Sequence, residues 1–237
     1  MSRQNHKYKM ITDINPRSPV SEAYKMLRTH IQYSMKQQHA KSILVTSSIA
    51  GEGKTLTAVN LAGVYALEEK KVIVLDADLR KPTMHHYFYP SRSSSQNGIG
   101  LSEVLMDQFD LAEGISQTHI PNLHFLQAGQ IPHHPSELLS SSKMDQVLSR
   151  LYQMYDVIII DSPPLLAVAD AQIAATKVDG VVLVVQAGKV KKSQLSKAKS
   201  TLELVKANLL GAVLNQKNKK EAESYYDRHQ PQSVFSK

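Results

Sequence analysis

The sequence has no cysteine, which excludes disulfide bonds and metal sites built on thiolates. It also has no apolar run approaching the roughly 20 residues that a membrane-spanning helix requires. Residues 1–9 are basic and polar, and they lack the apolar core of a secretory signal peptide. These absences lead us to expect a cytoplasmic protein, although a partner could still bring it to a membrane.

The charge of the chain is unbalanced toward basic residues, with a formal net charge of +7 over 237 residues. Lysine and arginine concentrate in residues 3–9, 189–199 and 217–220. A basic surface can meet anionic lipid, nucleic acid or an acidic partner, and it can equally serve solubility. The segments 189–199 and 217–220 contain no aromatic residue for base stacking, so we expect no nucleic-acid partner.

Short apolar runs rich in β-branched residues alternate with amphipathic segments along most of the chain. The predicted strands are residues 42–46, 72–75, 123–126, 157–160, 181–185 and 210–214, and the predicted helices are residues 21–36, 56–67, 136–154, 167–176 and 192–207. Continuous apolar strands suit a parallel sheet that helices cover on both faces. The alternation therefore predicts a doubly wound, mostly parallel α/β fold in a single domain.

The two ends of the chain differ in composition from this domain. Residues 1–16 have no apolar period and include Asn15-Pro16, so we expect an N-terminal arm rather than a core element. Residues 17–216 hold all the predicted strands and helices. Residues 217–237 are polar and are expected to form a flexible tail.

A phosphate-binding loop (P-loop) is predicted at residues 47–55, Ser-Ser-Ile-Ala-Gly-Glu-Gly-Lys-Thr, between a predicted strand and a predicted helix. The glycines let backbone N–H groups face phosphate oxygens, while the lysine can reach the β- and γ-phosphates and the threonine hydroxyl can bind Mg²⁺. Ser48 replaces the first glycine of the usual Gly-x-x-x-x-Gly-Lys-Ser/Thr pattern. The sequence thus predicts binding of a nucleoside triphosphate by Ala50, Gly51, Glu52, Gly53, Lys54, Thr55 and Leu56.

Carboxylates follow two further apolar strands, at Asp76, Asp78 and Asp161. The carboxyl ends of parallel strands form the ligand site of an open α/β sheet, beside the P-loop. Asp161 fits the aspartate that holds the Mg²⁺ water shell in P-loop enzymes. Asp76 and Asp78 are two residues apart and leave the strand on one face, so one carboxylate can tune the metal while the other accepts a proton. The residues therefore predict a metal site at Thr55 and Asp161, and they leave open which of Asp76 and Asp78 joins it.

The ten histidines show no metal-ligand spacing beside carboxylates. We therefore expect His85-His86 and His133-His134 to be solvated loop residues.

Three motifs together resemble the bacterial tyrosine kinases (BY-kinases), the cytosolic kinase domains tied to capsule and exopolysaccharide export. They are the P-loop sequence, Leu-Asp-Ala-Asp-Leu-Arg-Lys-Pro at 75–82 and Ile-Ile-Asp-Ser-Pro-Pro at 159–164. The similarity extends from about Ser21 to the tail. Glu22, Lys25 and Arg28 resemble the Glu-x-x-Arg-x-x-Arg oligomerisation motif of that family, with a lysine that cannot pair bidentately in place of the first arginine.

This resemblance implies an enzyme that uses ATP and Mg²⁺ to phosphorylate proteins on tyrosine. It implies catalytic roles for Lys54, Asp76, Asp78, Arg80 and Asp161, with Asp76 as the proton acceptor. The resemblance also implies that Mg²⁺ is held by Thr55, Asp78 and Asp161, directly or through water. Arg80 would either screen phosphate charge or organise its loop, and Asn215 would either hydrogen-bond the adenine edge or cap a turn.

The resemblance also implies a homo-oligomeric ring, such as an octamer, in which each tail enters the active site of the next subunit. The phosphoacceptors would be Tyr225 and Tyr226, a shorter tyrosine run than many relatives have. In the split arrangement of Gram-positive bacteria, a separate transmembrane activator supplies a cytosolic segment. That activator would recruit the kinase to the inner face of the cell membrane, where it regulates capsule or exopolysaccharide synthesis.

Two other functions fit parts of the same pattern. Partition and division-site ATPases share the fold, but they carry an extra lysine at the position of Ile49, and the tail lacks the amphipathic face that would enter lipid. An ATP-gated assembly scaffold is the other alternative, against which the complete set Lys54, Asp76, Asp78 and Asp161 argues.

Overall fold

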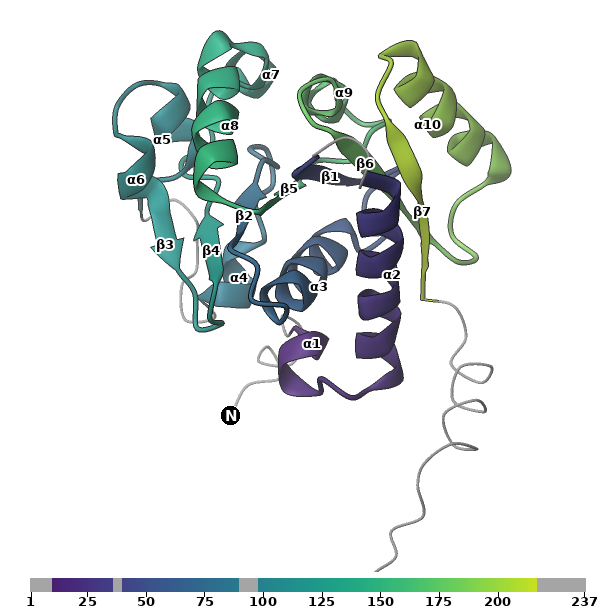
Figure 1. Ribbon diagram of the computed structural model, residues 1–237. Helices are drawn as coiled ribbons and strands as arrows, with labels where there is room; N and C mark the ends of the chain where they lie inside the picture. Colours follow the sequence, from purple (N-terminus) through teal and green to yellow (C-terminus); the bar gives the residue numbers. More distant parts are fainter. Residues whose placement is uncertain (1–9, 36–39, 90–97, 217–237) are drawn as a thin grey trace, which may run out of the picture.

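The computed structural model describes residues 10–35, 40–89 and 98–216. Within these ranges seven strands form one sheet in the order β3-β4-β2-β5-β1-β6-β7 (Figure 1). All neighbouring strands are parallel except β3, which runs antiparallel to β4 at one edge. The predicted doubly wound, mostly parallel fold is confirmed. The strands are β1 (Ser42–Ser47), β2 (Val72–Asp76), β3 (Ile115–Gln117), β4 (Leu123–Leu126), β5 (Val157–Asp161), β6 (Gly180–Gln186) and β7 (Leu209–Asn215).

Helices cover both faces of this sheet (Figure 1). One face carries α1 (Ile11–Ile14), α2 (Pro19–Met35), α3 (Lys54–Ala66) and α4 (His85–Phe88). The other face carries α5 (Leu101–Leu105), α6 (Leu111–Gly114), α7 (Pro135–Ser140), α8 (Ser142–Met154), α9 (Asp170–Ala175) and α10 (Lys192–Leu204). No helix of the described residues is both long and apolar enough to cross a bilayer.

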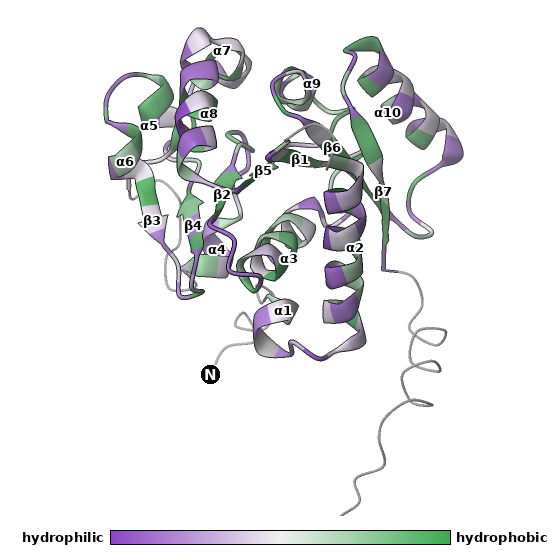
Figure 2. Cartoon of the chain, in the orientation of Figure 1, coloured by the Kyte–Doolittle hydropathy of each residue, from purple (hydrophilic) through white to green (hydrophobic). Residues whose placement is uncertain are grey.

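The apolar runs of the sequence are explained by burial on both faces of the sheet, where Figure 2 shows hydrophobic strands. Successive strand residues pack alternately into two cores. The core under α2 and α3 contains Ile43, Val45, Val72, Val74, Ile159, Val182 and Val184. The core on the opposite face contains Leu44, Ile73, Leu75, Ile158, Ile160, Val181 and Leu183. Each fully buried aliphatic side chain stabilises the fold by about 2 kcal/mol. This packing fixes the strands relative to one another, and therefore also the positions of their carboxyl ends.

The structure corrects the predicted N-terminal arm from Met10 onward. Met10 is 3% exposed and belongs to the core under α3. The Thr12 N–H and hydroxyl both donate to the Asn60 side-chain oxygen of α3, at 3.1 and 3.2 Å. A Cβ at position 63 would lie 2.9 Å from the Thr12 hydroxyl oxygen, so Gly63 leaves the space that this segment fills. A single methionine and two polar contacts produce no apolar period, which is why the sequence did not indicate this packing.

Three further boundaries differ from the sequence-based expectation. The predicted helix 136–154 is interrupted at Ser141, whose extended backbone separates α7 from α8 and whose hydroxyl donates to the Leu138 carbonyl. Serine side chains compete for backbone hydrogen bonds in this way, and residues 140–142 are three serines in succession. The helix predicted at 167–176 forms only over α9, and the short strand β3 was not predicted. The tail, with Tyr225 and Tyr226, lies outside the described residues.

Candidate active site

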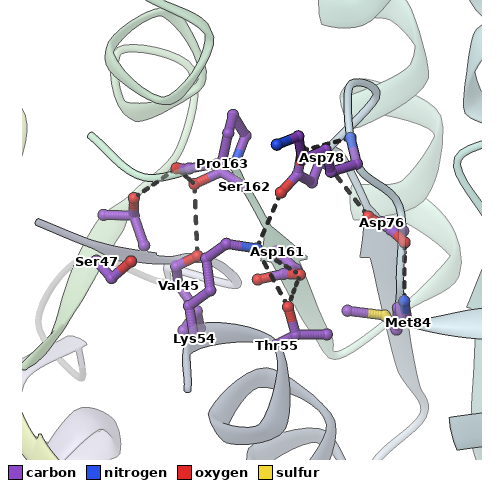
Figure 3. Close-up of polar contacts among 12 residues, drawn as sticks. Val45, Ser47, Lys54, Thr55, Asp76, Asp78, Met84, Asp161, Ser162 and Pro163 are labelled. Atoms are coloured by element: carbon purple, nitrogen blue, oxygen red, sulfur yellow. Dashed lines mark hydrogen bonds and ion pairs between the residues drawn. The ribbon is translucent and has the colours of Figure 1, made fainter. Parts of the chain in front are cut away.

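The candidate site lies where β1, β5 and β2 end side by side. Asp76 and Asp161 are paired in register on β2 and β5, and β1 leads directly into the P-loop and α3. Figure 3 shows the Lys54 side chain extending from the start of α3 toward Asp78 and Asp161. The structure thus brings together the P-loop and all three carboxylates that the sequence placed at strand ends.

The P-loop depends on glycine at two positions. Gly51 and Gly53 have φ values of 78° and 91°, in the left-handed region that favours glycine. A Cβ on residue 53 would also lie 2.1 Å from the side-chain nitrogen of Asn215. Gly53 is the N-cap residue of α3, so the backbone N–H groups of the loop lie at the positive end of that helix.

The Glu52 side chain stabilises the P-loop by linking it to β6. The carboxylate is fully buried and accepts hydrogen bonds from the Ile49 N–H at 2.7 Å and from the Gln186 N–H of β6 at 3.0 Å. Glu52 was predicted among the nucleotide-binding residues, and this geometry leaves only its backbone for that task. A charged carboxylate accepting two N–H bonds is a strong anchor.

Two other side chains hold the same loop. Asn215 donates from its side-chain amide to the Glu52 carbonyl at 2.8 Å, and its side-chain oxygen accepts the Gln216 N–H at 2.9 Å. These contacts favour the turn-capping alternative for Asn215 over the adenine contact. Lys189 was not predicted: its Nζ donates to the carbonyls of Ala50 and Gly51 at 3.0 and 3.1 Å. The sequence placed Lys189 only in a basic segment, because its contact depends on the end of β6 lying beside the loop.

The acidic cluster surrounds the Lys54 ammonium group. Its Nζ lies 3.0 Å from Asp78 Oδ2 and 3.4 Å from Asp161 Oδ2, and the Lys54 side chain is 12% exposed (Figure 3). The Thr55 hydroxyl donates to Asp161 Oδ2 at 2.6 Å. Asp76 is fully buried and accepts the N–H groups of Asp78 at 3.2 Å and Met84 at 3.1 Å.

Burial and mutual repulsion shift the protonation of these groups. Burial raises the pKa of Asp76 well above its usual range, and the charges of Asp161 and Asp78 raise it further against the opposing charge of Lys54. Burial also raises the pKa of Asp161, although Lys54 and the Thr55 hydrogen bond oppose that shift. For Lys54, burial disfavours the ammonium, but the three carboxylates prevail and raise its pKa above the ordinary value. A carboxylate with increased proton affinity beside a fixed cation is suited to proton transfer.

The residues present fit Mg²⁺ bound together with a nucleotide. Asp161 Oδ1 is buried and has no hydrogen-bond partner among the described residues, so this oxygen is free to accept from metal-bound water. Mg²⁺ prefers oxygen ligands and is usually held by one or two carboxylates together with substrate phosphates. Thr55 and Asp161 provide such oxygens, and Asp78 stands across Lys54 from them.

Arg80 is engaged by a residue that the sequence did not single out. Its Nε and Nη2 donate to the two carboxylate oxygens of Asp170, at 2.8 and 3.0 Å. This pairing raises the pKa of Arg80 and favours the loop-organising alternative for its role.

The structure also gives the surroundings of His85 and Arg28, two residues that the sequence singled out. His85, expected in a solvated loop, is 3% exposed within α4, and neither ring nitrogen has a hydrogen-bond partner in the part of the chain that is described. Burial lowers the pKa of His85 to about 4, so it packs as a neutral side chain. Arg28 turns inward: it donates to the Val64 carbonyl at 2.8 Å and lies 2.5 Å from the Glu68 carboxylate of the same chain.

Comparison with known proteins finds relatives that match most of the chain. A protein-family model described as an AAA domain matches residues 40–217. The chain is 42% identical to the tyrosine-protein kinase YwqD of Bacillus subtilis, over 88% of this chain and 86% of the relative. It is 38% identical to the putative tyrosine-protein kinase CapB of Staphylococcus aureus, over 89% and 90% of the two chains. The solved kinase domain of the Escherichia coli tyrosine kinase ETK superposes with a TM-score of 0.82 at 32% identity, over 91% of this chain and 84% of that domain.

Proposed function

Because this chain belongs to the bacterial tyrosine kinases, we propose that it transfers the γ-phosphoryl group of ATP to protein tyrosine. The observation that carries the proposal is the buried carboxylate of Asp76 beside the Lys54, Asp78 and Asp161 cluster. An ATPase needs only to position water, whereas a kinase needs a proton acceptor next to the place where a side-chain hydroxyl arrives. The raised pKa of Asp76 suits that task.

Each residue of the cluster has a distinct part in the proposed reaction. The P-loop N–H groups and Lys54 hold the β- and γ-phosphates, and Thr55, Asp161 and Asp78 would hold Mg²⁺. When bound, the ion neutralises phosphate charge and orients the phosphates for transfer. The tyrosine oxygen forms a bond to the γ-phosphorus, the bond to the β–γ bridging oxygen breaks, and the hydroxyl proton passes to Asp76.

The proposal extends to the setting of the reaction. We infer that the chain phosphorylates its own C-terminal tyrosines in trans and other protein substrates, and regulates capsule or exopolysaccharide synthesis. A transmembrane activator with a cytosolic segment would recruit it to the inner face of the cell membrane. The three sequence motifs and the kinase relatives support this setting.

Replacing both Tyr225 and Tyr226 by Phe is expected to remove most self-phosphorylation, because they are the two tyrosines of residues 217–237 and have Glu221, Glu223 and Asp227 close by in the sequence. The measurement is mass spectrometry of the C-terminal peptide after incubation with Mg²⁺-ATP, with and without a candidate activator segment. Phosphate on either tyrosine in the unsubstituted protein supports the kinase. Turnover of ATP with an unmodified tail would instead support the ATP-switch ATPase, and label that survives both substitutions would move the acceptors elsewhere.

The predicted oligomerisation residues divide into two groups by exposure. Glu22 and Lys25 pair at 2.7 Å on the surface of α2, whereas the Arg28 side chain is 13% exposed and joins α2 to α3. We expect Glu22→Ala with Lys25→Ala to weaken ring assembly without lowering the melting temperature. Arg28→Ala should also destabilise the subunit by about 1–2 kcal/mol, because the Val64 carbonyl loses the Arg28 donor and Glu68 keeps only its hydrogen bond from Gln32 among its contacts in the described residues. Sedimentation velocity measures assembly and thermal melts measure stability. Unchanged sedimentation of the double variant would show that Glu22 and Lys25 take no part in assembly.

A further inference from the structure

We propose that Asp170 is a positioning residue for phosphoryl transfer, acting through its ion pair with Arg80. The inference rests on the proposed kinase function and adds a residue that lies outside the P-loop and the three strand-end carboxylates. Asp170 is the first residue of α9, and it fixes the loop that carries Asp78 relative to the P-loop.

The Asp170 carboxylate is fully buried and is held by one guanidinium. The Asp170 side chain is 0% exposed, and Arg80 donates to both of its oxygens in a bidentate pair. In the described residues no other hydrogen bond to this carboxylate is found. A buried carboxylate with one cationic partner strongly resists separation, because an unpaired buried charge is costly. The Arg80 side chain, 40% exposed, is therefore tethered at its tip.

Arg80 belongs to a compact turn that is built around two of the site carboxylates. Asp76 accepts the N–H groups of Asp78 and Met84, and Asp78 accepts the Lys81 N–H at 3.1 Å. Arg80 lies between these anchored positions, two residues after Asp78. A displacement of Arg80 is consequently transmitted to the Asp78 carboxylate and to its contact with Lys54.

Asp170, on the other side of the pair, is connected to the P-loop. The segment between Asp161 and Asp170 is joined to β1 and the start of the P-loop by several hydrogen bonds. Leu165 N–H donates to the Ser47 carbonyl at 2.8 Å, Leu166 N–H donates to the Ser48 carbonyl at 3.3 Å, and the Thr46 hydroxyl donates to the Pro163 carbonyl at 3.0 Å. The Arg80–Asp170 pair therefore links the P-loop to the loop of Asp76 and Asp78 through a continuous set of contacts. These contacts fix the position of Asp78 relative to Lys54 and Asp161.

The chain offers a matched control for the pair itself. Arg150 and Asp110 form a bidentate pair with the same lengths, 2.8 and 3.0 Å, on the surface where α8 approaches α6. Both partners are about half exposed, and neither contacts the site. An ion pair that serves only stability would leave kcat unchanged at both places, although losing the buried pair would lower stability more.

The experiment compares Asp170→Asn and Arg80→Lys with Asp110→Asn in the full chain. Asparagine keeps the shape of Asp170 but loses its charge, and lysine keeps the charge of Arg80 but loses the bidentate fork. We expect kcat for tail phosphorylation to fall by about 10- to 100-fold in both site variants, as misplacement of a reacting group by about 1 Å does. The KM for ATP and the affinity for ADP should change less than about threefold, because the P-loop and Lys54 are untouched. Asp110→Asn should match the unsubstituted protein.

The double variant Arg80→Lys with Asp170→Asn completes the test. If the two residues act as one unit, kcat should fall no further in the double variant than in either single variant. Thermal melts and ADP titration establish that each variant is folded. If Asp170→Asn is unstable, Arg80→Lys still tests the positioning role. Folded site variants with unchanged kcat, or with kcat and ADP affinity falling together, would overturn the positioning role. An unsubstituted protein that transfers no phosphate in the same assay would overturn the kinase proposal itself, which is a distinguishable result.

Discussion

Lys54→Met is expected to abolish tail phosphorylation, with a loss of at least about 100-fold in rate, as for removal of one key donor to transition-state charge. Lys54 is the cation at the centre of the site, 3.0 Å from Asp78 and 3.4 Å from Asp161. Methionine retains the length of the side chain but supplies neither a donor to the phosphates nor a charge to the cluster. The measurement is phosphate incorporation into the C-terminal peptide by mass spectrometry, at saturating Mg²⁺-ATP.

Lys177→Met is the matched control for this substitution. The Lys177 side chain is 13% exposed, close to the 12% of Lys54, and it pairs with Asp145 at 2.5 Å away from the P-loop. The two variants remove lysines of nearly equal exposure, so a general effect of losing a largely buried cation should appear in both. Unchanged phosphate incorporation by the Lys54→Met variant would show that the P-loop takes no part in the reaction.

Asp76→Asn is expected to retain nucleotide binding and to lose phosphotransfer by about 10²- to 10⁴-fold, the usual contribution of a general base. Asp76 contacts the N–H groups of Asp78 and Met84 rather than the P-loop, so the phosphate cradle is left intact. An amide cannot accept the tyrosine proton, whereas a carboxylate whose pKa is raised by burial and by Asp161 accepts it readily. Titration with a fluorescent nucleotide and single-turnover transfer to the tail measure the two properties separately.

Asp179→Asn controls for the loss of a partly buried carboxylate that accepts backbone N–H groups. Asp179 lies by the start of β1, at the opposite end of the strand from the P-loop, and accepts the N–H groups of Lys41 and Ser42 at 2.8 Å. We expect that variant to lower the melting temperature and to leave phosphotransfer unchanged. Full phosphotransfer by Asp76→Asn would exclude Asp76 as the base.

The sequence by itself determined the main elements of the site. The P-loop could be recognised locally, because Gly51, Gly53, Lys54 and Thr55 have the spacing of a phosphate-binding loop between a strand and a helix. The convergence of Asp76 and Asp161 was also predictable, since each follows a buried strand and parallel strands end at one edge of the sheet. Strand composition alone, rich in β-branched residues, indicated a sheet that is buried on both faces.

Only the tertiary structure decided which side chains hold these elements in place. Arg80 and Asp170 are 90 residues apart in the chain, and Lys189 and the Ala50 carbonyl are 139 residues apart. The inward orientation of Glu52 and the packing of Met10 likewise depend on which strand or helix lies alongside. Such contacts leave no periodicity or spacing in the sequence, because each partner is supplied by a distant element that folding brings near. The sequence therefore determines the chemistry that the site can perform, and the packing of distant loops determines how its charges are positioned.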